Sequence, residues 1–184
     1  MTEAIEQKKQ LFKLKFKESD AFFSLTNIEN IRDYGKKPVW FIHYRKEYAS
    51  KRFYYKTDPV DRDTVIVTSF ELEPIVFYWD NKYLRCAKTD KYVCCFCHKN
   101  ECSGGSILFL SHNTDCAIEF TGYQDKGMLH YSKSPIYPGW SHNGGGFIIP
   151  AERQNKLEKN PVIAYHLIDS HHTLWMEQVN VESV

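Results

Sequence analysis

Short runs in which apolar and polar residues alternate are the feature that most constrains the fold of this chain. In the clearest run, Phe12, Leu14 and Phe16 alternate with three lysines. A period of two places successive side chains on opposite faces, so this run predicts a strand with one buried face. Similar runs recur along the chain, bounded by turn residues. The other predicted strands cover residues 39–44, 52–55, 64–70, 75–79, 106–110, 116–123, 128–131, 162–168 and 173–179.

Helical signals are few. The best covers residues 151–158, which follow Pro150 and precede Asn160-Pro161, a pair that disfavours continuation of a helix. One further turn of helix is expected near residues 98–103. This pattern predicts a mainly β, β-rich α+β chain, built as an antiparallel barrel or OB-like sheet with a small zinc-bound insertion and one or two short helices. No internal repeat or linker is visible, so we expect a single domain over residues 1–184, with a zinc-binding subdomain at 86–116 inside it.

All six cysteines fall between residues 86 and 116, and four of them lie within nine residues, at positions 94, 95, 97 and 102. Cysteines so close in sequence cannot easily bridge one another with disulfide geometry. The N-terminal residues show no signal-peptide pattern, which favours a reducing compartment. Metal binding is therefore the leading use of the cluster, and reduced structural cysteines without a metal are the alternative.

The spacing Cys94-x2-Cys97 lets two thiolates reach one tetrahedral ion from a tight turn, which points to structural zinc. Cys86 precedes this pair, and Cys102 follows it. The fourth position stays open among Cys102, His98, His112 and Cys116. The predicted zinc ligands are Cys86, Cys94, Cys97 and Cys102.

Charge is segregated along the sequence. The whole chain carries a formal charge of +1, but residues 31–56 hold eight Lys or Arg against two acidic residues, and eight aromatic residues are interleaved with them. Cationic groups that neutralise phosphates beside rings on which unpaired bases stack are typical of single-strand binding. A solvated strand face with alternate aromatics turned inward is the simpler alternative. The predicted contacts to single-stranded DNA or RNA are Trp40, Tyr44, Phe53, Tyr54 and Tyr55 for stacking, with Arg45, Lys46, Lys51, Arg52 and Lys56 for phosphates.

Catalytic groups are harder to assign, because the chain lacks the Gly-x-Ser-x-Gly, phosphate-loop and His-Glu-x-x-His motifs. We therefore expect no enzymatic activity. Two alternatives remain. One is a protein-interaction or inhibitor module that uses exposed aromatics, since Tyr, Trp and Arg dominate interface hot spots. The other is a metal-dependent nuclease that uses His142 and Asn143 with Asp115 or Glu119.

The order of residues 75–86, ending in Trp79, Arg85 and Cys86, followed by Cys94-x2-Cys97 and two predicted strands, resembles the zinc-containing OB-fold single-stranded DNA-binding proteins of tailed bacteriophages. The resemblance covers residues 75–123. It implies a barrel with an aromatic, basic groove and an inserted zinc subdomain. That family's zinc set includes a histidine well upstream of the first cysteine, where this chain offers His43, and the acidic tail common among such proteins is absent here.

The sequence also bears on compartment. No run approaches the roughly 18 consecutive apolar residues of a membrane span. With no signal-peptide pattern either, we expect an intracellular, cytoplasmic protein that makes no use of a membrane.

Overall fold

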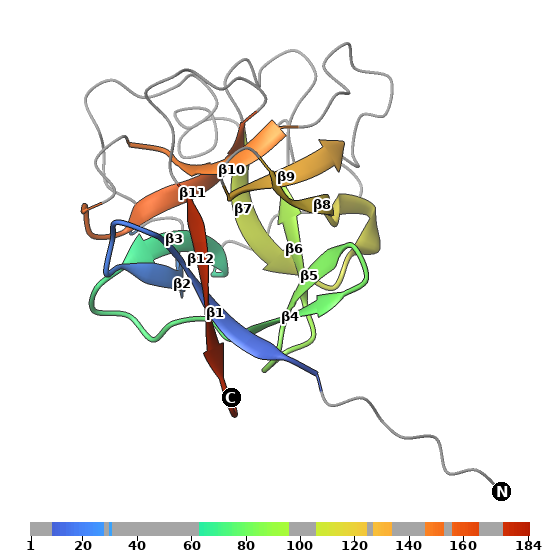
Figure 1. Cartoon of the computed structure of the whole chain (residues 1–184), viewed down its shortest axis with the longest axis horizontal. Helices are drawn as coiled ribbons and strands as arrows, with labels where there is room; N and C mark the ends of the chain where they lie inside the picture. The colour runs from blue at the N-terminus through green and yellow to red at the C-terminus, as the bar shows by residue number, and fades with distance from the viewer. Residues whose placement is uncertain are drawn as a thin grey trace, which may run out of the picture.

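The computed structural model describes residues 9–27, 30, 63–95, 106–124, 127–133, 146–152, 156–165 and 175–184 (Figure 1). Within these ranges the chain is mainly β, and all paired strands are antiparallel. A 3-10 turn, η2 (Thr114–Cys116), separates two of the strands. The strands are β1 (Leu11–Phe16), β2 (Phe22–Thr26), β3 (Val65–Ser69), β4 (Phe77–Asp80), β5 (Tyr83–Cys86), β6 (Tyr92–Cys95), β7 (Ser106–Ser111), β8 (Glu119–Gln124), β9 (Met128–Lys133), β10 (Gly146–Pro150), β11 (Asn160–Tyr165) and β12 (Met176–Val181).

The strand pairing repeats every four strands. In each of the units β1–β4, β5–β8 and β9–β12, the first strand pairs with the second and the second pairs with the third. The chain therefore contains a threefold structural repeat, which the sequence did not reveal.

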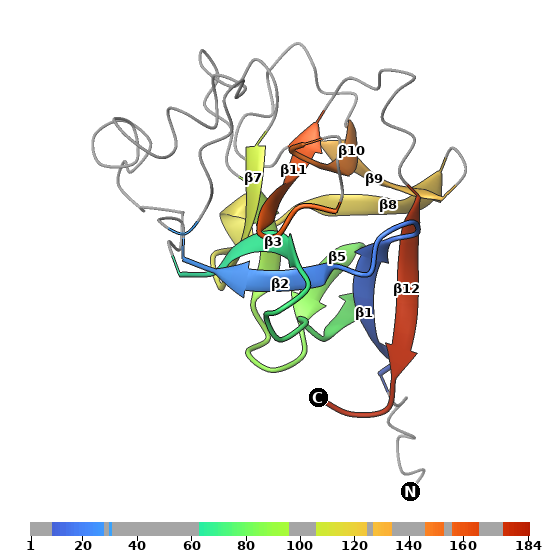
Figure 2. The ribbon, with the colours of Figure 1, turned by 90° about the vertical axis from the view of Figure 1, so that its left-hand side faces the viewer.

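The first and last strands of the three units close a ring of six strands. Ladders join β12 to β1, β1 to β4, β4 to β5 and β8 to β9. The remaining two junctions are single backbone hydrogen bonds: Phe120 N donates to Lys82 O (2.8 Å) beside β5, and Met176 N donates to Gly127 O (3.0 Å) beside β9. Figure 2 shows β1 and β12 side by side.

The middle strands of each unit form three hairpins, β2–β3, β6–β7 and β10–β11. These hairpins also pair with one another, because β3 contacts β7, β7 contacts β11 and β11 contacts β3. A six-stranded ring joined to a triangle of hairpins is the connectivity of a β-trefoil.

Apolar side chains from the ring and the hairpins meet in one large core. The strands β4, β8 and β12 contribute Phe77, Phe120 and Met176 to it, and β1 contributes the alternating Phe12, Leu14 and Phe16. The hairpins are buried on both faces: Ile66 of β3 faces this core, whereas its neighbours Val65 and Val67 belong to a second cluster. Because successive strand residues point to opposite faces, such strands are apolar throughout rather than alternating.

The antiparallel barrel predicted from the sequence is confirmed in this coarse form. The OB-like order is not observed, because an OB fold closes five strands and this ring closes six.

The helix predicted over residues 151–158 is not seen either: the described residues at both ends of that range form bends and turns. The cause lies in Asn160, whose side-chain oxygen accepts from Glu152 N and whose amide donates to Glu152 O, both at 3.1 Å. These bonds bring together the two ends of the connection between β10 and β11.

No helix in the described ranges is long and apolar enough to cross a membrane.

Candidate functional site

The predicted nucleic-acid contacts lie outside the described residues, in the connection between β2 and β3. The structure does place the two ends of this connection, because Thr26 at the end of β2 pairs with Val65 at the start of β3. The contacts concerned are Trp40, Tyr44, Arg45, Lys46, Lys51, Arg52, Phe53, Tyr54, Tyr55 and Lys56.

The predicted zinc ligands divide between described and undescribed residues. Cys97 and Cys102, with the alternative His98, lie outside the described ranges, whereas Cys86 and Cys94 are buried in β5 and β6. Cys86 belongs to the main core and Cys94 to the second cluster, so the structure does not bring these two thiols together. Within the described ranges, no three metal-ligating side chains gather at one point.

The structure pairs Cys94 with Cys116 instead. An isolated bridge joins Cys94 to Ala117, which places η2 against β6. The Cys116 thiol donates to Asn113 O at 3.1 Å, and the Cys94 Sγ lies 3.8 Å from the same oxygen. The two cysteines are 1% and 0% exposed. Burial, with the hydrogen bond to Cys116, raises the pKa of the Cys94 thiol, so in the absence of a metal this thiol stays protonated.

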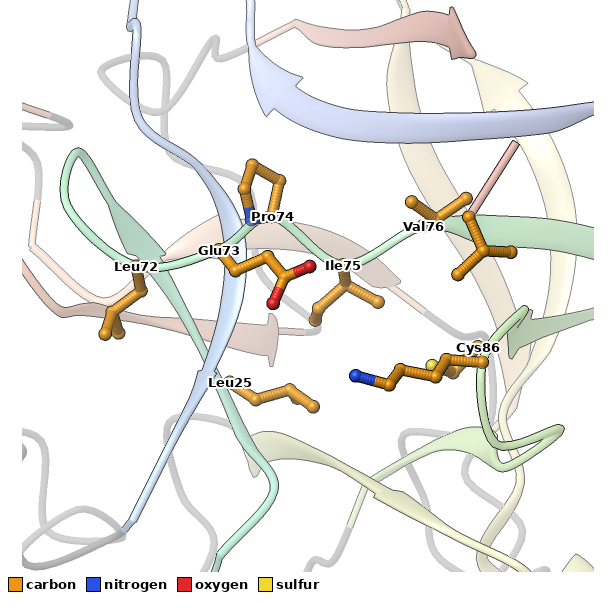
Figure 3. Close-up of a pocket in the computed structure, with 9 residues that line it drawn as sticks. Leu25, Leu72, Glu73, Pro74, Ile75, Val76 and Cys86 are labelled. Carbon is orange, nitrogen blue, oxygen red and sulfur yellow. The ribbon is translucent and has the colours of Figure 1, made fainter. Parts of the chain in front are cut away.

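A pocket of about 300 Å³ opens near the turn that follows β5 (Figure 3). Its wall is the chain between β3 and β4, from which Glu73 and Ile75 extend toward Leu25 of β2. The lining is mainly apolar, with Glu73 and Lys88 as its charged side chains. The lining residues are Leu25, Leu72, Glu73, Pro74, Ile75, Val76, Cys86, Lys88 and Val184.

A second group of side chains, the Arg85 network, lies across β4, β5 and β6. Arg85 is opposite Tyr78 of β4 on one side and Tyr92 of β6 on the other. Its guanidinium lies over both rings: the Arg85 Cζ is 5.8 Å from the Tyr78 ring centroid and 4.3 Å from that of Tyr92. Arg85 Nη1 contacts Asp80 Oδ2 at 2.9 Å, while its Nε and Nη2 donate to Asp90 O at 3.0 and 2.7 Å. The charge of this arginine is therefore already matched.

Hydrogen bonding in the Arg85 network also changes the acidity of its members. Tyr78 is 4% exposed and its hydroxyl donates to Asp90 Oδ1 at 2.6 Å. Burial, together with this bond to a carboxylate, raises the pKa of Tyr78 to about 12. The same bond lowers the pKa of Asp90. The network thus holds the turn between β5 and β6, where Asp90 adopts a positive φ of 59°, against β4.

A third group, the β1 lysine face, consists of Lys13, Lys15 and Lys17 with Phe22 and Trp175. Lys15 is opposite Phe22 of β2 on one side and Glu177 of β12 on the other. Its Nζ lies 5.9 Å from the Phe22 ring centroid, and that of Lys13 lies 6.0 Å from it. Lys17 N donates to Trp175 O at 2.7 Å, and Lys17 Nζ lies 4.6 Å from the Trp175 ring.

The nuclease candidates are not assembled by the described residues. Glu119 forms an ion pair with Lys82 (3.3 Å) and accepts from the Tyr83 hydroxyl (3.4 Å), so it ties β8 to β5. Asp115 lies in η2, and His142 and Asn143 fall outside the described ranges.

The alternating pattern correctly predicted that the lysines of β1 point away from the core. It did not predict that aromatic side chains lie beside them. Phe22 and Trp175 lie far apart in sequence, and only the pairing of β2 and β12 with β1 brings them beside the lysines. No local pattern could have indicated this arrangement.

Comparisons with models of protein families, with curated proteins and with solved structures found no match to this chain.

Proposed function

We propose that this chain is a non-enzymatic protein that binds single-stranded DNA or RNA. The observation that carries the proposal is the composition of residues 31–56, where a local excess of basic residues coincides with eight aromatic residues in a chain that is nearly neutral overall. Lysine and arginine supply the sequence-independent attraction to phosphates, and aromatic rings supply stacking of unpaired bases.

The fold supports this proposal by giving the basic segment a fixed base. The hairpin β2–β3 pairs over five residues, from Phe22 with Ser69 to Thr26 with Val65, and β3 pairs in turn with β7 and β11. A segment whose two ends are held side by side loses less conformational freedom on binding than a free tail.

A titration with fluorescent oligonucleotides at several salt concentrations tests the proposal. We expect single strands to bind more tightly than duplexes, with an affinity that falls steeply as the salt concentration rises. In a plot of log affinity against log salt concentration, each phosphate contact should contribute about 0.7 to the slope. Replacing both Tyr54 and Tyr55 by Ala should weaken binding about fivefold or more per stacked base. Absence of binding at about 50 mM salt, where phosphate contacts are strong, would refute the proposal.

We further propose that zinc stabilises the segment around β6, with Cys94 and Cys116 as two of its ligands. Their thiols lie against a common oxygen, Asn113 O, whereas Cys86 belongs to the main core. The remaining ligands would come from Cys97, His98 and Cys102. Bound zinc would cross-link these ligands, and its uptake would release thiol protons.

Metal analysis of protein prepared without chelator tests the zinc proposal. We expect about one equivalent of zinc, lost in Cys94→Ser and Cys116→Ser and retained in the matched control Cys86→Ser. Retention of zinc by Cys116→Ser would remove Cys116 from the ligand set. An absence of zinc from the unaltered protein would refute the zinc proposal.

Three exposed aromatic side chains favour a second candidate, a module that binds a protein partner. Phe70, Tyr123 and Trp175 are 49%, 40% and 37% exposed, and rings of this kind anchor protein interfaces. A partner captured equally well at low and high salt, without retention of nucleic acid, would select this candidate over the first.

A further inference from the structure

The β1 lysine face has a regular spacing. Lys13, Lys15 and Lys17 occupy alternate positions along β1 and the residue after it, while Phe12, Leu14 and Phe16 point into the core. Alternate residues of an antiparallel strand lie about 6.8 Å apart on one face. The buried residues fix the strand register, so the lysines form a straight row whose direction is set by the core.

Aromatic rings border this row on two sides. Phe22 comes from β2 on one side, and Trp175 precedes β12 on the other. Trp175 is 37% exposed, so part of this side chain is open to solvent beside Lys17, whose Nζ lies 4.6 Å from the ring. The backbone next to Trp175 is held by Met176 N, which donates to Gly127 O at 3.0 Å.

The charge of the row is only partly matched. Glu177 is the acidic residue beside it, at 3.8 Å from Lys15 Nζ, and Lys15 has a side chain only 17% exposed. Within the described part of the chain, no ion pair involves Lys13 or Lys17. Glu18 and Asp20 lie in the turn that follows Lys17, at one end of the row. Along the row itself three lysines therefore stand beside one acid, Glu177, with the exposed Trp175 and the half-buried Phe22 at their sides.

We propose that the β1 lysine face is a binding surface for a single-stranded nucleic acid, with Lys13 and Lys17 contacting phosphates and Trp175 stacking on a base. The proposal rests on the proposed function and adds a second surface to it, separate in sequence from residues 31–56. A row of cations beside an exposed ring matches a flexible polyanion with planar bases, whereas a duplex hides its bases from such a ring.

The test compares the double variant Lys13→Gln/Lys17→Gln with Lys88→Gln/Lys156→Gln. Both variants remove two exposed or half-exposed lysines, but Lys88 belongs to the turn after β5 and Lys156 to the connection between β10 and β11. Binding of a fluorescent oligothymidylate is measured from low to moderate salt. The first variant should reduce the log–log salt slope by about 1.4, at 0.7 per lost phosphate contact, and the control should leave the slope unchanged.

Trp175 is tested in the same titration. Trp175→Ala should weaken binding about 5- to 150-fold, the range found for a stacked base, and Trp175→Phe should restore most of the loss. Urea unfolding of each variant checks that the fold is intact, because Trp175 also contacts Lys17.

The outcomes separate this inference from the proposed function. If the unaltered protein binds and the β1 variants bind equally well, the β1 lysine face is not a binding surface, while the proposal for residues 31–56 stands. If the unaltered protein does not bind, both proposals fail. If the β1 variants and the Lys88/Lys156 control lose affinity equally, the attraction is a general effect of charge and the inference is overturned.

Discussion

Cations lie over aromatic rings in two regions of this molecule, and the two differ in what else the cation touches. In the Arg85 network, the guanidinium also contacts the Asp80 carboxylate and the Asp90 carbonyl. In the β1 lysine face, Lys17 lies over Trp175 with no ion pair among the described residues. The same pairing of residue types can therefore hold strands together, as at Arg85, or carry a cation with no ion pair among the described residues, as at Lys17. The partners of the cation decide which role it has.

Replacing Arg85 should have the largest effect on stability. We expect Arg85→Met to lower the free energy of unfolding by about 3 kcal/mol, because it removes three hydrogen bonds and leaves Asp80 without its partner. Arg85→Lys should recover only part of the loss, since an ammonium cannot reproduce the planar fork.

The control for Arg85 comes from the other region. Lys17→Met removes a cation over a ring but no ion pair, and should change the free energy of unfolding by less than about 0.5 kcal/mol. Urea titration with unchanged m values measures both. If the two substitutions lowered the free energy of unfolding equally, the Arg85 network and the β1 lysine face would not differ in their contribution to stability.

Raising the pH should have the next largest effect on stability, because it deprotonates Tyr78. Its pKa is raised from 10.0 to about 12 in the folded protein, so the stabilisation is fully present below pH 10 and is lost as the pH rises toward 12. The loss should reach about 2–3 kcal/mol.

Tyr78→Phe isolates this effect from other groups that titrate in the same range. The variant should be less stable at neutral pH but should show a flatter decline above pH 10. Ultraviolet absorbance of the phenolate, followed with urea unfolding, gives both quantities. A decline as steep in Tyr78→Phe as in the unaltered protein would assign the alkaline loss to other residues.

Removing the acid from the β1 lysine face should have the smallest effect on stability. Glu177→Gln should change the free energy of unfolding by less than about 0.5 kcal/mol, because its contact with Lys15 is long and partly exposed. The same substitution should raise affinity for single strands a few-fold at low salt. Glu182→Gln, beyond β12, provides the control, and equal gains in both variants would mean that the position of the charge on the face does not matter.

The sequence predicted strands that overlap β1, β3, β4, β7, β8, β9, β11 and β12. The alternation of Phe12, Leu14 and Phe16 with lysines marked β1, and the structure confirms it. It did not reveal β2, β5 and β6, which have only four or five residues each. Cys94 stood out as a possible zinc ligand, although it is also a residue of a buried strand.

Two further features were hidden for a different reason. The start of β10 lies in a glycine cluster, which is typical of a loop, yet Gly146 pairs with Tyr131 of β9. The threefold repeat left no trace in sequence because packing at a core position requires volume rather than identity: β4, β8 and β12 fill it with Phe77, Phe120 and Met176. The register between distant strands, which builds the β1 lysine face, depends on the whole core.

The pairing of β1 with β12 also determines when the molecule can finish folding. Leu11 is opposite Val181, so this pairing joins two strands that are far apart in the sequence. Contacts between residues far apart in the sequence slow folding, because a long loop must close before the contact can form and stabilise the fold. Until this pairing forms, the edge of β1 that β12 covers is open to other strands, and charged side chains such as lysine on an edge strand disfavour aggregation.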